Sequence, residues 1–496
     1  MTGQSHVTDA EERAALERVP TDLFIGGEWR AASGGGTLAV EDPATGKSLI
    51  EVADATPADA LAALGAAADA QAAWAATAPR ERGEILRRAY ELLLARADEL
   101  ALVMTLEMGK ALGESKAEIT YAAEFLRWFS EEAVRIHGRY MTNTTGAGRI
   151  LTMRQPVGPC VFVTPWNFPT AMGTRKIAPA IAAGCTMVVK PAQQTPLSML
   201  ALARLLAEAG LPAGVLNVIT AKHSGEVIEP LLKDPRTRKL SFTGSTEVGR
   251  TLIAQSAEQV LRVSMELGGN APFIVFEDAD LEAAVEGALT AKLRNVGEAC
   301  TAANRFHIHE SIADEFAKRM AERMAALKLG RGTEPGVDIG PLIDDRQRDI
   351  VAELVEDAVS RGSKLLIGGE RLSGHAYPGY FFTPTVLAGV PAGARILSEE
   401  VFGPVAPISA FSTEEQAISA ANATEYGLVA YLYTRDLART LRVSEAIEAG
   451  MVGVNQGIVS NPAAPFGGVK QSGFGREGGF EGIGEYLETK YVALNV

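Results

Sequence analysis

The amino-acid sequence predicts an α/β protein with doubly wound parallel sheets. Its 496 residues exceed what one hydrophobic core normally serves, so we expect two or three subdomains. Between Gly158 and Asn270, short apolar runs alternate with helical patterns, which is typical of a parallel sheet with crossover helices. The predicted strands are Cys160–Val163, Met187–Lys190, Val215–Ile219 and Leu240–Phe242.

Helical patterns precede these strands and fill the crossovers between them. Thr56, Pro57 and Asp59 supply an N-cap, a first-turn proline and an early acid to an alanine-rich helix. The predicted crossover helices are Ile177–Gly184 and Pro196–Gly210, the second of which ends at a glycine. A further helix has an apolar face, which we expect to cover the sheet. The face consists of Ile85, Leu86, Ala89, Leu92 and Leu93.

A second alternating region begins after Asn270. Phe273–Phe276 and Arg305–Ile308 are predicted as strands, with Asp280–Asn295 as the helix between them. Because this region is separate from the first, it indicates a second α/β domain, which carries Cys300.

The charge balance excludes some classes of partner. The chain has 47 Lys and Arg against 61 Asp and Glu, a formal net charge of −14, which disfavours nucleic acid because that affinity is built from neutralised phosphates. The amino terminus has neither a basic nor an apolar leader region, and no apolar run of about 20 residues occurs elsewhere. We therefore expect a cytoplasmic protein with no membrane partner.

The cysteines and histidines do not predict a metal site. Cys160, Cys185 and Cys300 are odd in number and widely spaced, which fits neither a disulfide framework nor a zinc site. His307 and His309 point the same way along a predicted strand, but no carboxylate or cysteine with ligand spacing accompanies them. We therefore interpret His307 and His309 as a hydrogen-bonded or solvated pair.

Cys300 and Glu266 are the main candidates for catalysis. A thiolate is strongly nucleophilic, and the small neighbours Gly297 and Ala299 leave room for a substrate. Glu266 follows an apolar strand and precedes two glycines, where the backbone can approach closely. Judged by residue type alone, a buried structural thiol and a capping or surface carboxylate are the alternatives.

These motifs resemble those of the aldehyde dehydrogenase superfamily, and the resemblance runs from about Leu23 to Val492. Glu266–Gly269 is similar to the Glu-Leu-Gly-Gly segment of that family, and Gly297–Cys300 is similar to its nucleophile segment. Glu298 replaces the usual glutamine there. We expect this replacement to be a surface-type change that leaves the nucleophile in place.

The resemblance implies covalent catalysis. The thiolate of Cys300 attacks the aldehyde carbonyl, and the Asn167 side chain and the Cys300 N–H stabilise the oxyanion. Glu266 is implied as the base for thioester hydrolysis, and Glu477 as a second acid that assists proton transfer. Two other classes stay open: acyl transfer to coenzyme A, which does not need Glu266, and a silent structural protein, which the catalytic set argues against.

The resemblance also implies an aldehyde dehydrogenase-like fold of two doubly wound parallel α/β domains plus a small β oligomerisation arm. Turn-rich Thr142–Gly148 and the extended tail Tyr486–Val496 would belong to this arm, although their residues alone also suit ordinary surface hairpins. We expect a homo-oligomer, either a dimer or a tetramer. The implied bounds are 1–136 and 157–265 for a dinucleotide-binding domain, 266–463 for a catalytic domain, and 137–156 and 464–496 for the arm.

A cofactor site is predicted where Phe242–Gly249 leaves a strand and opens a helix, because the exposed N–H groups can face a pyrophosphate. Gly473–Gly478 has Gly-x-Gly-x-x-Gly spacing but follows a loop, and we reject it as a dinucleotide motif. Neutral Gln193 stands where family members restricted to NAD often carry Glu, which favours NADP without excluding NAD. The implied cofactor residues are Trp166, Asn167, Lys190, Gln193, Gly244, Ser245, Leu267, Glu400 and Phe402.

Three further residues indicate the substrate class. Arg175, Arg294 and Ser460 resemble the carboxylate-contacting residues of the branch that oxidises succinate semialdehyde. Two guanidinium groups near a thiol suit a substrate with an anion at its far end. Glutarate semialdehyde is the near alternative. Ala302 stands where some members carry a second cysteine, so no regulatory disulfide is predicted.

Overall fold

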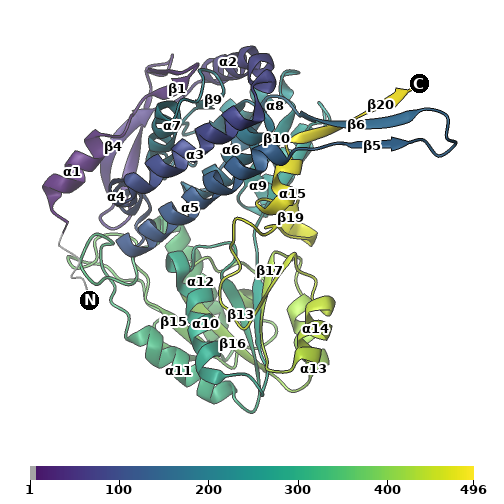
Figure 1. The fold of residues 1–496 in the computed structure, drawn as a ribbon. Coiled ribbons are helices and arrows are strands. Elements are labelled where there is room, and N and C mark those ends of the chain that lie inside the picture. The colour runs from purple at the N-terminus through teal and green to yellow at the C-terminus, as the bar shows by residue number, and fades with distance from the viewer. Residues whose placement is uncertain (1–6, 496) are drawn as a thin grey trace.

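The computed structural model describes residues 7–495 and contains two α/β domains, with a β arm that projects from the first (Figure 1). An eight-stranded sheet forms the centre of one domain and a seven-stranded sheet the centre of the other. Helices pack around both sheets. The predicted fold class is confirmed. Residues 1–6 of the predicted first domain and Val496 of the predicted tail lie outside the described residues.

The eight-stranded sheet contains all four strands predicted for the first region, and they run parallel. Strand β7 is buried except at its last residue, which explains why the sequence shows continuous apolar runs rather than alternation. Antiparallel strands close both edges. The order is β19 (Gly473–Phe474), β11 (Arg262–Glu266), β10 (Lys239–Thr243), β7 (Cys160–Val163), β8 (Met187–Lys190), β9 (Leu216–Val218), β1 (Leu23–Ile25) and β2 (Glu28–Arg30).

The predicted helix signals of the first domain are confirmed. Thr56 and Asp59 form a reciprocal capping box at the start of helix α2. The predicted apolar face on α3 is buried except for Leu92, which is half-buried. The helices are α1 (Asp9–Glu17), α2 (Pro57–Ala76), α3 (Pro79–Ala95), α4 (Ala97–Met108), α5 (Leu112–Glu132), α6 (Ala171–Ala183), α7 (Leu197–Glu208), α8 (Ser224–Lys233) and α9 (Thr246–Ser256).

Helix α6 begins at Ala171, six residues before the predicted start at Ile177. The cap comes from another helix: Oε1 of Glu118 in α5 accepts the N–H groups of Thr170 and Ala171 at 3.0 and 3.1 Å. A carboxylate at this end also complements the helix dipole. The local sequence contains no such cap, so local signals placed the start too late.

The second domain has the predicted strands around Phe273 and Arg305, with helix α10 (Leu281–Leu293) between them. Its sheet is parallel apart from one edge strand. The strand order is β14 (Lys364–Ile367), β15 (Thr385–Ala388), β16 (Val405–Phe411), β13 (Ala303–His309), β12 (Ala271–Val275), β17 (Val429–Tyr433) and β18 (Met451–Val454). The remaining helices are α11 (Ala313–Ala325), α12 (Asp345–Ser360), α13 (Glu414–Asn422) and α14 (Leu437–Ala446).

The β arm is a three-stranded antiparallel sheet of β5 (Arg139–Thr142), β6 (Arg149–Pro156) and β20 (Leu487–Leu494). It extends away from both domains (Figure 1). Helix α15 (Gly479–Gly484) leads into it, and a separate hairpin of β3 (Thr37–Asp42) and β4 (Lys47–Ala53) packs near α4.

The structure is consistent with the interpretation of the histidines. His307 Nδ1 lies 2.9 Å from Ser409 Oγ, and His309 Nδ1 lies 2.8 Å from Ser311 Oγ. No cluster of three metal-ligating side chains occurs among residues 7–495. Within the same range, no helix is long and apolar enough to cross a membrane.

Candidate active site

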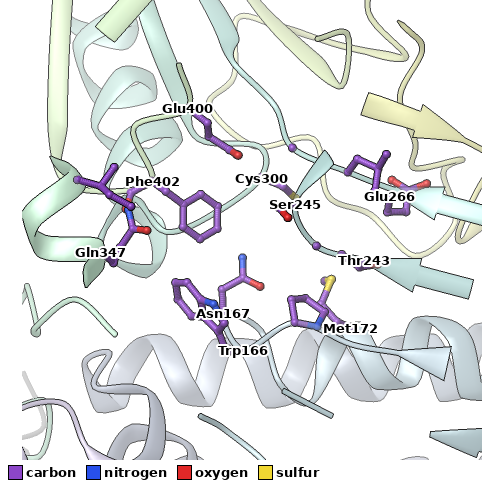
Figure 2. Close-up of a pocket in the computed structure, with 15 residues that line it drawn as sticks. Trp166, Asn167, Met172, Thr243, Ser245, Glu266, Cys300, Gln347, Glu400 and Phe402 are labelled. Atoms are coloured by element: carbon purple, nitrogen blue, oxygen red, sulfur yellow. The ribbon is translucent and has the colours of Figure 1, made fainter. Parts of the chain in front are cut away.

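A cavity of about 280 Å³ lies where the carboxyl ends of β10 and β11 meet the second domain. Figure 2 shows Trp166 and Asn167 on one side of it and Glu400 and Phe402 on the opposite side. The predicted residues in its wall are Trp166, Asn167, Gly244, Ser245, Glu266, Leu267, Cys300, Glu400 and Phe402. The sequence reasoning missed Pro165, Met172, Thr243, Gly268, Gln347 and Ile350.

Cys300 follows a strained turn that ends α10. Asn295 and Val296 have φ angles of 55° and 59°, in the left-handed region that costs energy for residues other than glycine. A Cβ atom on Gly297 would lie 2.3 Å from the carbonyl oxygen of Gly403, so only glycine fits there. The turn therefore holds the segment that leads to Cys300 close to Gly403 of the same domain, with a fixed backbone.

Cys300 is half-buried, whereas Cys160 and Cys185 are buried. Removal of the Cys300 thiol from water raises its pKa to about 12. The positive charge of Arg175 opposes this increase, whereas the carboxyl groups of Glu400 and Glu266 add to it. The thiolate needed for attack is thus favoured by the nearby guanidinium and disfavoured by the nearby acids.

Asn167 is held next to the nucleophile segment. Its Nδ2 donates a hydrogen bond of 2.9 Å to the carbonyl oxygen of Glu298. The backbone carbonyl oxygen of Asn167 accepts a hydrogen bond of 2.8 Å from Lys110 Nζ. Lys110 Nζ also forms an ion pair with Glu118 at 2.6 Å. Glu118 also accepts the Thr170 N–H at the start of α6. The buried Lys110–Glu118 pair therefore holds both the Asn167 backbone and the start of the helix that follows it. The second Nδ2 hydrogen is available for a ligand oxygen.

Glu266 ends β11 as a buried carboxyl, and its Oε2 atom has no hydrogen-bond partner. Burial raises the pKa of Glu266 well above its usual range, and the nearby Glu477 carboxylate raises it further. Glu477 contacts Lys176 Nζ at 2.5 Å and Arg175 Nε at 2.9 Å. Although burial favours its neutral form, these two cations lower the pKa of Glu477. Glu266 is therefore the more basic of the two carboxylates.

The expectation that Glu298 is a surface-type replacement was wrong. Its side chain is completely buried, and its Oε1 atom accepts a hydrogen bond of 3.1 Å from the Ile343 N–H. Burial raises the pKa of Glu298 well above its usual range. The side chain points inward because the backbone before α12 presents an N–H group that needs a buried acceptor.

The start of α9 has the geometry of an anion site. Ser245 is its N-cap and accepts the Val248 N–H at 3.4 Å, while the preceding Gly244 lines the cavity. A Cβ on Gly249 would lie 2.5 Å from the Leu267 side chain, so the helix and β11 approach closely. Free N–H groups and the helix dipole at this end favour a phosphate group.

Glu400 and Phe402 form the opposite wall. Glu400 Oε1 accepts the Gly269 N–H at 3.2 Å, and burial raises the pKa of Glu400 to about 7. Phe402 has a φ of 48°, and its ring meets the Trp166 ring edge-on with centroids 5.4 Å apart. Gln347 supports this wall, because its Nε2 donates to the Phe402 carbonyl oxygen at 2.9 Å.

Lys190 and Gln193 do not line the central cavity. Lys190 Nζ, at the end of β8, contacts Ser224 Oγ at 2.5 Å, and burial lowers the pKa of Lys190 to about 8. Gln193 lines a different cavity of about 380 Å³, together with Lys222. Lys190 ends β8 and Gln193 follows it, and α9 follows β10 of the same sheet, so all three lie at the carboxyl ends of the parallel strands.

Of the three residues predicted to bind a carboxylate, Arg294 and Ser460 lie together and Arg175 lies elsewhere. Arg294 Nη1 donates to Ser460 Oγ at 3.2 Å, and both line a third cavity of about 180 Å³. The Arg294 guanidinium lies over the rings of Tyr121 and Phe168, at 5.4 and 4.8 Å from their centroids. Arg175 lines neither this cavity nor the central one.

Arg175 instead packs in a buried layer. Its guanidinium stacks on the Phe466 ring at 3.8 Å and pairs with Glu477. Its Nη2 atom is buried without a hydrogen-bond partner. Arg175 is nevertheless near enough to influence the charge states of Cys300 and Glu266.

Several supporting residues carry no linear signal. Lys110 acts on the site from the loop between α4 and α5, and Glu118 and Tyr121 act on it from α5, all distant in sequence from any motif. The one available hint is the presence of charged residues within otherwise apolar helix patterns, since charges are rarely buried unless paired.

Comparison with known proteins finds relatives that match most of this chain. A protein from Paenarthrobacter nicotinovorans described as succinate-semialdehyde dehydrogenase is 60% identical over 446 residues, 90% of this chain and 98% of that protein. A glutarate-semialdehyde dehydrogenase from Pseudomonas putida is 50% identical, covering 95% of this chain and 97% of the relative. The crystal structure of an NADP-dependent enzyme of E. coli superposes with a TM-score of 0.95 at 49% identity, covering 97% and 99% of the two chains.

The family model described as "Aldehyde dehydrogenase family" matches residues 29–492, which is nearly the whole chain. The members are NAD(P)-dependent oxidoreductases. The chain belongs to the aldehyde dehydrogenase family.

Proposed function

We propose that this protein oxidises succinate semialdehyde to succinate with NAD(P), and that water releases the product. The observation that carries the proposal is the arrangement around Cys300: an amide donor on one side, a basic carboxylate on the other, and a guanidinium cavity nearby. The relatives described as succinate-semialdehyde dehydrogenases support the same substrate. Glutarate semialdehyde is the second candidate, favoured by relatives at 50% identity.

The proposed chemistry has two stages at Cys300. The Cys300 thiol loses its proton to solvent, and the resulting thiolate sulfur bonds to the aldehyde carbon while the carbonyl π bond becomes an oxyanion, which Asn167 Nδ2 and the Cys300 N–H stabilise. A bound nicotinamide would supply the acceptor for the hydride that leaves the substrate carbon, and the substrate would then stay on Cys300 as a thioester. Glu266 then takes a proton from water, the hydroxide attacks the thioester carbon, and the carbon–sulfur bond breaks to give the acid. Because Glu266 supplies this base, hydrolysis is favoured over transfer to coenzyme A.

The cofactor fits the first domain, for which we propose the bounds 1–136 and 157–265. The α9 N-terminus would hold the pyrophosphate through Gly244 and Ser245, and Lys190 would contact the adenosine ribose. Glu400 would bind the nicotinamide ribose next to Phe402. Neutral Gln193 lacks the charge that would repel a 2′-phosphate, so NADP is the favoured cofactor, with NAD as the alternative.

The substrate carboxylate would bind Arg294 and Ser460 in the catalytic domain, 266–463. The rings of Tyr121 and Phe168 hold the guanidinium, and its remaining donors stay available. Arg175 is proposed to assist by adding positive charge near the same pocket. The arm, 137–156 and 464–496, is proposed to pair subunits of a dimer or tetramer, in line with its exposed Tyr140 and Tyr491.

Initial rates with succinate semialdehyde and with butanal, each with NADP and with NAD, test the proposal. We expect kcat/KM for the semialdehyde to exceed that for butanal by at least tens-fold, because charge-assisted hydrogen bonds contribute about 1.5–3 kcal/mol each. Glutarate semialdehyde measured in parallel decides between the two chain lengths. Equal rates with butanal would leave only a general aldehyde dehydrogenase.

Arg294→Met will lower kcat/KM for succinate semialdehyde by about 10- to 100-fold. The substitution keeps a long apolar side chain between Tyr121 and Phe168 but removes the charge. Butanal has no carboxylate and serves as the internal control, so its kcat/KM should change little. A parallel loss with both substrates would mean that Arg294 supports the fold rather than the carboxylate.

Asn167→Ala will lower kcat by roughly 10² to 10³-fold, the usual effect of losing one oxyanion donor. The loss should fall on kcat more than on KM, because the hydrogen bond strengthens as negative charge develops on oxygen. Steady-state rates over a range of semialdehyde concentrations measure this separation. A variant whose defect lies wholly in KM would show that Asn167 only binds substrate.

A further inference from the structure

Glu298 is a fully buried acid two residues before the nucleophile. Within residues 7–495 its carboxyl forms no ion pair, and only one of its two oxygens has a hydrogen-bond partner. A buried carboxylate without a cation is costly, whereas a neutral carboxyl group is not. Its place in the structure therefore calls for an explanation beyond packing.

Three chain segments meet at Glu298. Its carbonyl oxygen accepts hydrogen bonds of 2.9 Å from Nδ2 of Asn167 and from Nδ2 of Asn295. Its side chain reaches the Ile343 N–H, which lies just before α12. One residue thus joins the Asn167 loop, the strained turn and α12 to the segment that ends at Cys300.

The contact with Ile343 continues to the opposite wall of the cavity. Asp344 is the N-cap of α12, and its side chain accepts the Gln347 N–H at 2.8 Å. Gln347 in turn donates to the Phe402 carbonyl oxygen. Glu298 therefore links the nucleophile segment to the helix that supports Phe402.

A negative charge on Glu298 would be unfavourable. Burial raises its pKa well above the usual range; the Ile343 N–H and Lys110 oppose this effect, and the Asp344 carboxylate adds to it. Lys110 is the cation on this side, but it is already bonded to Glu118 and to the Asn167 carbonyl oxygen. Burial without a cation of its own therefore favours the neutral form of the side chain.

We propose that Glu298 is a positioning residue whose buried carboxyl group clamps the segment carrying Cys300 onto the backbone of Ile343. The proposal rests on the proposed role of Cys300 as nucleophile.

Two substitutions test the clamp. Glu298→Gln keeps the acceptor without a charge, and at pH 7 its kcat should stay within about twofold of the native value. Glu298→Leu keeps the bulk but leaves the Ile343 N–H unpaired, and should lower both kcat and the alkylation rate of Cys300 by about tenfold or more. Iodoacetamide reports on Cys300 in this assay because Cys160 and Cys185 are buried.

Asp59→Asn is the matched control, because Asp59 is another buried carboxyl that caps a helix, at the start of α2. It should lower the unfolding midpoint without changing the alkylation rate. Native kcat and alkylation in Glu298→Leu, or an equal loss in Glu298→Gln, would overturn the proposal. The alkylation measurement needs no substrate, so it gives an answer even if the proposed semialdehyde is wrong.

Discussion

Cys300→Ser will lower kcat for semialdehyde oxidation by at least about 10⁴-fold, as expected when a covalent nucleophile is removed. A serine hydroxyl is a far weaker nucleophile than a thiolate at neutral pH. The surroundings of this position already raise the pKa of the thiol to about 12, and the same burial would oppose ionisation of a hydroxyl. Absorbance of the reduced cofactor measures the loss.

Cys160→Ala provides the control for this substitution. Cys160 lies in β7, is fully buried and takes no part in the cavity wall, so the variant should keep most of the turnover while losing some stability. Cofactor binding, followed by protein fluorescence, should survive in Cys300→Ser. Turnover by Cys300→Ser at a rate comparable with the native protein would place the nucleophile elsewhere.

The strands β7 and β8 of the first domain were predictable because they are almost wholly buried. A strand covered on both faces is mainly apolar, as in these two, and flanking glycines and helical patterns then set its limits. Helix ends were less predictable. The start of α6 depends on Glu118, which is 52 residues away in sequence, and no local pattern contains that information.

The central residues of the site were predictable from motifs, since Asn167, Glu266 and Cys300 all line one cavity. What sequence could not supply is the pairing between distant segments. Arg175 meets a partner 302 positions later, at Glu477, and this pairing keeps it out of the Arg294 cavity. Glu298 was misjudged because glutamate is usually exposed, and only the tertiary structure shows the N–H that holds it inside.

Glu266→Gln will keep an initial burst of reduced cofactor but will lower the steady rate by about 10² to 10⁴-fold, the range of one general base. Oxidation of the bound aldehyde does not need a base for water, so the first turnover proceeds. Glutamine cannot take a proton from water, and the protein then accumulates as the thioester. Rapid mixing with succinate semialdehyde resolves the burst from the steady rate.

The pH profile separates this role from a structural one. Because burial and Glu477 raise the pKa of Glu266, the native protein has little basic carboxylate at low pH, and deacylation speeds up as pH rises towards that pKa. The increase should be absent in Glu266→Gln. A native steady rate in the variant would contradict the assignment.

Hydroxylamine makes the test specific to the thioester. It is a strong nucleophile that attacks a thioester without help from a protein base, so it should restore steady turnover in Glu266→Gln and yield a hydroxamate. It should do nothing for Cys300→Ser, which forms no thioester. If hydroxylamine failed to rescue Glu266→Gln, the block would lie before the thioester, and Glu266 would act in the attack of Cys300 rather than in hydrolysis.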